Sequence, residues 1–282
     1  MFFEGMELLL QIIFDKIYKT VYKGEKMITI KNTPNLTGVV ISGDFNDFYY
    51  LVEVLHEITV NEYSEKHHQY YDISTRVLGL CYDIRHAYQG DREIELVDNH
   101  MTEDLMKWHS IITPKSNVYY SCKYLYPEMF FVMLALNRLV ELRIKELTKA
   151  KYIYREALDK KVIWDDTIAT IRSFQAAFAK CVKETFTTAA FSRWLSVMNS
   201  DNIGIENIAG QYVDLLNIKY INMTKEKRKK NLSSIAKRIA EFRYDSDHEE
   251  IKKVVMEAAK EFRCQPGEIR LQGIEYPEDI EW

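Results

Sequence analysis

The sequence predicts an α+β protein in which a small N-terminal part of mixed strands and helices, residues 27–125, packs on a larger, mainly helical part, residues 126–282. Short β-branched runs bounded by turn residues are concentrated in the first part. From residue 126 onward, apolar residues recur every three or four positions. No long Gly-, Ser- or Pro-rich linker separates the two parts, so we expect a single domain over residues 27–282.

The N-terminal part is expected to contain a strand pair, two helices and two further strands. The sequence Ser42-Gly43-Asp44, with Asp47 three residues on, is a helix N-terminal signal. Gly90 is placed to end the second helix. The expected strands are 28–30, 38–42, 93–97 and 117–122, and the expected helices are 48–58 and 70–89.

The C-terminal part begins with a helix that we expect to be central. Its apolar positions step by three and four from Met129 to Leu147, and the flanking aromatic residues make its first half apolar nearly all round. We expect the end of the chain, residues 268–282, to return as a strand and a turn. The further helices are expected at 165–184, 188–199, 208–217, 225–242 and 248–262.

Residues 1–26 differ from the rest of the chain. Residues 23–26 can be encoded as AAA-GGA-GAA-AAA, a purine-rich ribosome-binding site directly before Met27. The hypothesis is that Met27 is the natural start and residues 1–26 are a non-native extension. The alternative is an accessory amphipathic helix, because the apolar positions between Leu9 and Ile17 fall at helical spacing.

Composition and cysteine usage indicate a cytoplasmic globular protein. The 282 residues are 47% hydrophobic and 28% charged, with a net charge of −4, which excludes a polycation that coats nucleic acid. The four cysteines lie far apart without a Cys-x-x-Cys pair, as is typical of reduced, buried thiols. The uncharged run Leu8–Phe14 lacks the flanks of a signal peptide and is far shorter than the roughly twenty residues that span a bilayer. We therefore expect no membrane association.

The predicted helix 70–89 carries candidate binding residues. Arg76 and Gly79 lie on one stripe beside its apolar face, and Arg85 follows near its end. A glycine within a helix costs about 1 kcal/mol relative to alanine, so we expect a packed backbone or a ligand to approach closely at Gly79.

Asp83 and His86 lie on the same stripe and form a candidate catalytic pair. At i and i+3, the carboxylate can hold the imidazole in one tautomer for acid/base chemistry. The alternative is structural: an ion pair between Asp72 and Arg76, with a packing or capping contact between Asp83 and His86.

A second polar cluster follows the predicted strand 93–97. Asp98, His100 and His109 are candidate metal ligands, if the chain folds them back against the Asp83 and His86 pair. The spacing matches no standard metal motif, and the sequence assigns no cofactor. The alternative is a polar loop closed by a helix N-cap at Thr102.

Charge is unevenly distributed near the C-terminus. Residues 219–243 carry nine basic and two acidic residues, a net charge of +7, whereas residues 245–282 carry five basic and eleven acidic residues, a net charge of −6. Lys227, Arg228 and Lys230 are expected on the cationic face of an amphipathic helix, where they could bind an acidic protein partner or nucleic-acid phosphates. The alternative is that the acidic segment neutralises this face within the fold.

Several segments resemble a family of uncharacterised proteins from Gram-positive bacteria, catalogued only as a domain of unknown function. The resemblance runs from about Met27 to the C-terminus. It implies a bacterial source and a cytoplasmic setting, and it supplies no catalytic residues. The segments are Ile30–Asn35, Arg76–Ile94, Met106–His109, Asn117–Ser121 and Asn217–Arg228.

Three functions remain open from the sequence. The favoured hypothesis is a non-enzymatic binding or regulatory module, because the glycine-rich phosphate loops, the nucleophile elbow and the His-Glu-x-x-His zinc motif are all absent. The second is a hydrolase or nuclease, metal-dependent or acid/base, that uses the Asp/His cluster. The third is a nucleic-acid-binding module that uses the basic helix.

Overall fold

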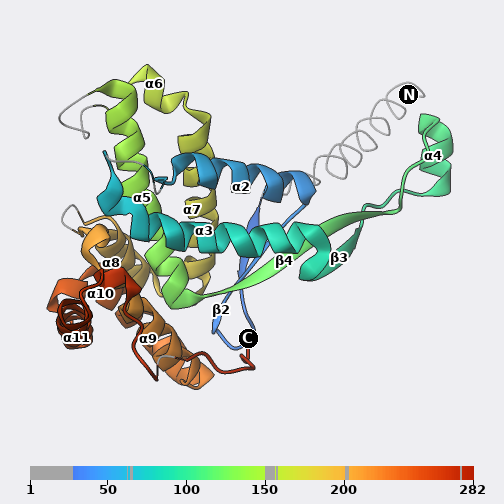
Figure 1. Cartoon of the computed structure of the whole chain (residues 1–282). Helices are drawn as coiled ribbons and strands as arrows, with labels where there is room; N and C mark the ends of the chain where they lie inside the picture. The colour runs from blue at the N-terminus through green and yellow to red at the C-terminus, as the bar shows by residue number, and fades with distance from the viewer. Residues whose placement is uncertain are drawn as a thin grey trace.

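A four-stranded antiparallel sheet forms in the N-terminal part of the chain, and helices make up most of the remainder (Figure 1). The computed structural model describes residues 28–282 except 62, 64, 65, 150–155, 157, 201, 202 and 274. The strand order is β1-β2-β4-β3. The strands are β1 (Thr29–Asn32), β2 (Gly38–Gly43), β3 (Glu93–Asp98) and β4 (Ser116–Leu125). The predicted α+β class is confirmed.

The strand β4 is the centre of the sheet. Its second half pairs with β2 from Tyr120 to Leu125, and its first half pairs with β3 from Ser116 to Ser121. Close packing at the β2 end requires Gly38, because a Cβ there would collide with the carbonyl oxygen of Tyr124. The hairpin of β1 and β2 is the predicted strand pair.

Two helices of the N-terminal part pack on each other, α2 (Phe45–Ile58) and α3 (Tyr71–His86). The predicted N-terminal signal of α2 is confirmed as a capping box, in which Asp44 and Asp47 each accept a hydrogen bond from the other's backbone N–H. A π-helical turn extends α3 to Asp91, and Gly90 in it has a φ of 93°, a conformation that favours glycine.

The helix α5 (Tyr126–Thr148) follows β4 without a loop and is central, as predicted. Every residue from Tyr126 to Leu136 is buried, including the acidic Glu128. The helix packs against α3, α9 and α10 and against the sheet. The remaining helices are α4 (Glu103–His109), α6 (Lys160–Ile163), α7 (Asp166–Thr185), α8 (Thr188–Met198), α9 (Gly210–Ile221), α10 (Lys225–Ala240) and α11 (Ser246–Phe262).

Three of the four cysteines, Cys81, Cys122 and Cys181, are buried as predicted, whereas Cys264 is only half-buried, and all four are free thiols. No helix among the described residues has both the length and the apolar character needed to cross a membrane. The predictions about residues 1–26 lie outside the described residues.

The predicted strand near the C-terminus is wrong. Residues Pro266–Glu268 form a 3₁₀ turn, and none of the described residues after it, 269–273 and 275–282, lies in a strand. The side chain of Gln211 in α9 takes the place of a strand partner: it donates to the carbonyl oxygen of Ile269 and accepts from the backbone N–H of Leu271. The segment then returns to the turn between β1 and β2, where the N–H of Asn35 donates to the carbonyl oxygen of Trp282, 3.2 Å away.

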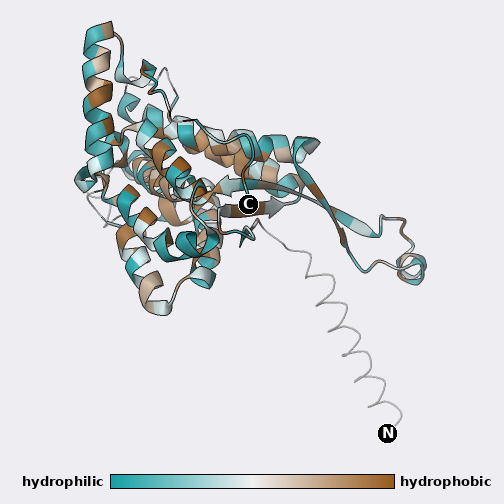
Figure 2. Ribbon diagram, turned by 90° about the horizontal axis from the view of Figure 1, so that it is seen from below, coloured by the Kyte–Doolittle hydropathy of each residue, from teal (hydrophilic) through white to brown (hydrophobic). Residues whose placement is uncertain are grey.

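Residues 93–118 form a projection that we call the arm (Figure 1). It consists of β3, the short helix α4 at its tip and the first residues of β4. Figure 2 shows the arm extending away from the helical body. The alternation at 93–97 predicts a half-buried strand, and the strand is confirmed, but none of its residues is buried.

Candidate functional site

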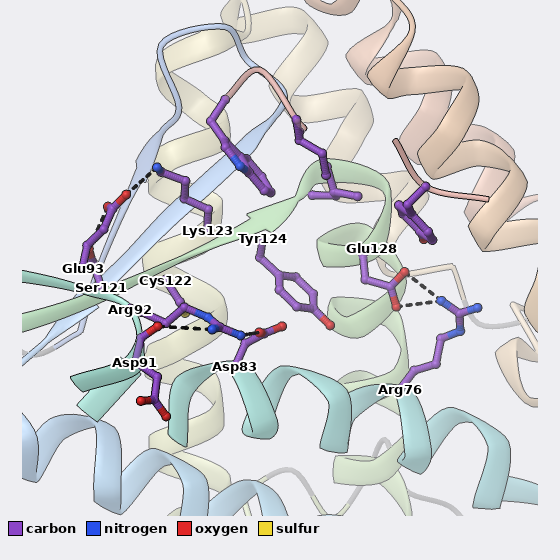
Figure 3. Close-up of a pocket in the computed structure, with 14 residues that line it drawn as sticks. Arg76, Asp83, Asp91, Arg92, Glu93, Ser121, Cys122, Lys123, Tyr124 and Glu128 are labelled. Carbon is purple, nitrogen blue, oxygen red and sulfur yellow. Dashed lines mark hydrogen bonds and ion pairs between the residues drawn. The ribbon is translucent and has the colours of Figure 1, made fainter. Parts of the chain in front are cut away.

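A cavity of about 640 Å³ lies between α3, β4, the first turn of α5 and the C-terminal segment (Figure 3). It contains two of the candidate residues from the predicted helix stripe, Arg76 and Asp83. Its lining residues are Arg76, Asp83, Asp91, Arg92, Glu93, Ser121, Cys122, Lys123, Tyr124, Leu125, Glu128, Tyr276, Ile280 and Trp282.

One end of the cavity is closed by the guanidinium of Arg76. Its Nη1 donates to both carboxylate oxygens of Glu128, at 3.0 and 2.8 Å. Its Nη2 donates to Asp214, at 2.8 Å, and to the carbonyl oxygen of Gly210, at 2.6 Å. Burial lowers the pKa of Arg76, but the two carboxylates outweigh it and raise that pKa above its ordinary value. Arg76 therefore joins α3 to α5 and α9, rather than pairing with Asp72.

The C-terminal segment is tied into the same network through Tyr276. Its hydroxyl donates to Asp214 at 3.1 Å and accepts from the side-chain amide of Asn217 at 2.8 Å. That amide also donates to Glu128 at 2.8 Å. A continuous set of hydrogen bonds thus fixes the segment over the cavity.

The other end of the cavity contains a second set of ion pairs. Arg92 donates to one carboxylate oxygen of Asp83 at 3.0 Å, and Lys123 pairs with Glu93 across the strands β4 and β3. The thiol of Cys122 lines the wall nearby, and burial raises its pKa to about 12, so it is neutral near pH 7 and a poor nucleophile.

Tyr124 projects from β4 between these two ends, and Figure 3 shows its ring between Asp83 and Glu128. The side chain is only 9% exposed. No hydrogen bond to its hydroxyl forms within the described residues. Burial raises its pKa well above the ordinary value, so the phenol stays neutral and can both donate and accept.

The close approach predicted at Gly79 is not found among the described residues. A Cβ added there would meet only the hydroxyl oxygen of Tyr124, at 3.8 Å, which is an ordinary contact. Arg85, the third candidate binding residue on this helix, is exposed, and its guanidinium lies 5.7 Å from the ring centroid of Tyr82.

The two residues of the candidate pair, Asp83 and His86, each pair with a different residue. Asp83 pairs with Arg92, as described above, and Nδ1 of His86 lies 2.8 Å from a carboxylate oxygen of Asp91. No hydrogen bond joins Asp83 to His86 in the part of the chain that the structure describes. Asp83 lines the cavity, whereas the ring of His86 contacts the exposed ring of Tyr82 in a tilted arrangement, with the ring centroids 4.1 Å apart.

The candidate metal ligands Asp98, His100 and His109 lie in the arm. Asp98 and His100 approach each other at 3.6 Å, and both side chains are more than 70% exposed. Among the described residues, no group of three or more His, Cys, Asp or Glu side chains is arranged to bind a metal ion. The expected convergence on Asp83 and His86 does not occur, because the β3–β4 ribbon carries these residues away from α3. The alternative N-cap at Thr102 is present, where the side chain accepts from the N–H of Leu105.

The basic block is partly neutralised within the fold. Arg228, expected on the cationic face, is only 4% exposed and donates to the carbonyl oxygens of Tyr220, Ile221 and Asn35 and to the hydroxyl of Thr37. It is thus a structural residue that joins α9 and α10 to the turn between β1 and β2.

The other basic residues of the block divide between the two predicted alternatives, neutralisation by the acidic segment and an exposed cationic face. Arg238 pairs with Asp245 and Asp247 of the following acidic segment. Lys227 and Lys230 are exposed on α10 and keep a cationic outer face.

Sequence patterns missed the residues that complete the cavity, notably Tyr124, Glu128, Asp214 and Tyr276. One signal was available for Glu128. It is the single acidic residue in the apolar run that opens α5, and a carboxylate in an otherwise buried segment requires a buried partner. Nothing in the local sequence identifies Arg76 as that partner.

Searches of curated proteins and of solved structures found no match to this chain. One family model, described as Domain of unknown function (DUF6904), matches residues 28–282, which confirms the expected domain of unknown function and its extent along the chain. The chain therefore belongs to the DUF6904 family, a family whose function has not been assigned.

Proposed function

We propose that the protein is a non-enzymatic binding module that docks onto another protein through the arm, residues 93–118. The observation that carries the proposal is the apolar surface that the arm leaves exposed to solvent.

One face of the β3–β4 ribbon supplies the first part of this surface. Leu96 is opposite Val118 in the antiparallel register, and Ile94 is opposite Tyr120. Residues opposite each other point to the same face of a sheet. Ile94, Leu96 and Val118 are 54%, 69% and 42% exposed, so the face is uncovered at these positions, whereas Tyr120 packs against the core.

The tip of the arm supplies the second part. Trp108 is 83% exposed and Ile112 is fully exposed, and the helix α4 buries none of its residues. A two-stranded ribbon without a packed face is marginally stable in water. Large exposed apolar patches mark interaction sites in soluble proteins.

The charge of the arm defines the chemistry of the partner. Residues 93–118 carry two basic and five acidic residues, a net charge of 2 − 5 = −3. A matching surface has an apolar groove with basic groups at its rim, because complementary charge steers association and like charge opposes it.

Site-specific photo-crosslinking tests the proposal. A photoreactive phenylalanine analogue replaces Trp108 in the full chain, made in the cells that naturally produce the protein. Trp164 is a matched control, since it is equally exposed at 84% but lies outside the arm. We expect a protein adduct from position 108, no such adduct from position 164, and loss of the position-108 adduct when Leu96→Asp is added.

Two results would contradict the proposal: equal adducts from positions 108 and 164, or an adduct from position 108 that survives Leu96→Asp. An adduct with twice the mass of the chain would identify the partner as a second copy. An adduct whose mass differs from twice that of the chain, and which is lost in the Leu96→Asp variant, would identify the partner as a different protein.

A further inference from the structure

The cavity beneath the C-terminal segment has the features of a ligand site that is independent of the arm. Two of its properties point to a ligand: the charge balance of its walls and the unpaired hydroxyl of Tyr124. Each limits the chemistry of what can bind there.

Each basic side chain in the cavity wall is already paired with a carboxylate of the protein. Arg76 is bound by Glu128 and Asp214, Arg92 by Asp83, and Lys123 by Glu93, as described above. An anionic ligand would have to displace one of these carboxylates, and the displaced carboxylate would lose its own partner. Anions are therefore poorly matched to the site.

The carboxylates of the wall are in excess. Three basic and four acidic side chains line the cavity, a net charge of 3 − 4 = −1, and Asp214 lies directly behind Arg76. Only one oxygen of Asp83 is bound by Arg92, and its second oxygen has no hydrogen bond within the described residues. This oxygen is an acceptor available to a cationic donor.

The hydroxyl of Tyr124 is the second acceptor. Its side chain is nine-tenths buried and points into the cavity, where no described residue bonds to it (Figure 3). The hydroxyl oxygen itself keeps some accessible surface, and a ligand N–H can donate to it. Figure 3 shows this ring between Asp83 and Glu128.

Aromatic and aliphatic side chains complete the wall. Tyr124, Tyr276 and Trp282 bring three aromatic rings to the cavity, and Leu125 and Ile280 bring aliphatic surface. Aromatic faces attract ammonium groups through their quadrupole. The carboxylates do not converge as metal ligands do, and no metal-binding group occurs among the described residues, so an organic cation fits the site better than a metal ion.

We propose that this cavity binds an organic ammonium ion, in which a protonated amine contacts Asp83 and Tyr124 and a short alkyl chain lies against Leu125 and Ile280. The amine can belong to a free small molecule or to the lysine side chain of a peptide, because both present the same group.

Isothermal titration calorimetry on the full chain tests this proposal with matched probes. Butylammonium and 1,5-diaminopentane present the ammonium group, whereas butyrate and 1-butanol present an anion and a neutral hydroxyl on a similar alkyl chain. A short peptide with blocked ends and one central lysine represents the second source. We expect the amines, the peptide or both to bind, with butyrate and 1-butanol at least about tenfold weaker.

Two substitutions locate the binding. Tyr124→Phe removes only the hydroxyl, which has no hydrogen-bond partner among the described residues, so the melting temperature should not change while the amine binds about tenfold more weakly. Asp83→Asn removes the charge and should weaken binding at least as much. Tyr120→Phe is the matched control, because Tyr120 lies on the same strand but does not line the cavity, and it should bind as the unmodified chain does.

The proposal is overturned if neither amines nor the peptide bind at about 10 mM, or if butyrate binds as tightly as butylammonium. It is equally overturned if Tyr124→Phe, with an unchanged melting temperature, retains full affinity. Binding of the peptide alone would identify a protein side chain as the ligand, and binding of the free amines would identify a small molecule.

Discussion

The strand β4 links two regions of opposite character. Its second half, near Tyr124, borders a cavity in which each arginine and lysine is paired with a carboxylate. Its first half, near Val118, forms part of an arm whose apolar side chains are exposed and whose tip helix buries no residue. The same strand therefore borders a cavity lined by ion pairs at one end and carries an exposed apolar surface at the other.

This difference separates residues that hold the fold from residues that remain available for binding. In the body, a side chain lost from the ion-pair network leaves buried partners behind. In the arm, the side chains are exposed to solvent, so removing one leaves no buried group without its partner. Substitutions in the ion-pair network of the body should therefore reduce the free energy of unfolding, whereas substitutions in the arm should change association and little else.

Arg76→Met should have the largest effect. Glu128 and Asp214 would remain without their cation, and breaking a buried ion pair by removing one partner costs about 3–5 kcal/mol. Arg85→Met on the same helix is the control, because Arg85 is exposed, and it should cost less than about 0.5 kcal/mol. Urea denaturation of both variants measures the difference. Similar losses in the two variants would show that the network does not stabilise the body.

His248→Leu should have the next largest effect. His248 is 1% exposed, and its Nε2 accepts a hydrogen bond from the backbone N–H of Ala209 at 3.0 Å. Leucine would leave that buried N–H unpaired, at a cost of about 1–3 kcal/mol near neutral pH.

The same substitution should reduce the pH dependence of stability. Burial lowers the pKa of His248 below its ordinary value of 6.5, so the unfolded chain binds this proton more readily than the folded chain. His248 therefore makes its full contribution to stability above pH 6.5, the ordinary pKa, and this contribution is lost as the pH falls below that value. Urea denaturation at about pH 5.5 and 7.5 measures this. His109→Leu in the arm is the control, and an equal loss of pH dependence in that variant would contradict the assignment.

The helix N-caps offer a smaller, matched contrast. Asp44 caps α2 in the body and Thr102 caps α4 in the arm, and each side chain accepts from a backbone N–H three residues on. Asp44→Ala should lower the free energy of unfolding by about 1 kcal/mol. Thr102→Ala should leave it unchanged and instead speed amide hydrogen exchange in α4, since this helix buries no residue. A loss of global stability in Thr102→Ala would mean that the arm unfolds together with the body.

Leu96→Asp should also have little effect on stability, less than about 0.5 kcal/mol, because the side chain is 69% exposed. Its expected effect is on association, through the loss of the crosslinked adduct from position 108. Thermal unfolding of the isolated chain provides the stability measurement. A destabilisation of more than about 1 kcal/mol would show that the arm face packs against the chain itself.

Local patterns predicted most elements well, and the exceptions have physical causes. The capping residues Asp44 and Asp47 and the terminating Gly90 act through their own backbone neighbours, so sequence patterns identify them. The prediction of a strand near Leu271 was wrong because the backbone there bonds to a side chain instead of to another strand. That side chain, Gln211, lies about sixty positions earlier in the chain. A short apolar run indicates that its side chains need to be buried, but it does not indicate which part of the chain packs against them.

The candidate site was predicted only in part for the same reason. Arg76 and Asp83 were identified because helical spacing aligns them on one stripe. Tyr124 and Glu128 were not, because their place in the cavity depends on how β4 and α5 pack against α3.

The sequence by itself determined the α+β class, the order of most helices and strands, the central position of α5 and the burial of three cysteines. These follow from periodicity, capping and turn residues, which act within a few positions of the chain. The tertiary structure alone decided which charges pair, that Arg228 is buried, and that the alternating strand at 93–97 projects into solvent. Those outcomes depend on contacts between residues far apart in sequence, and hydrophobic or charged character at one position does not specify the partner that meets it.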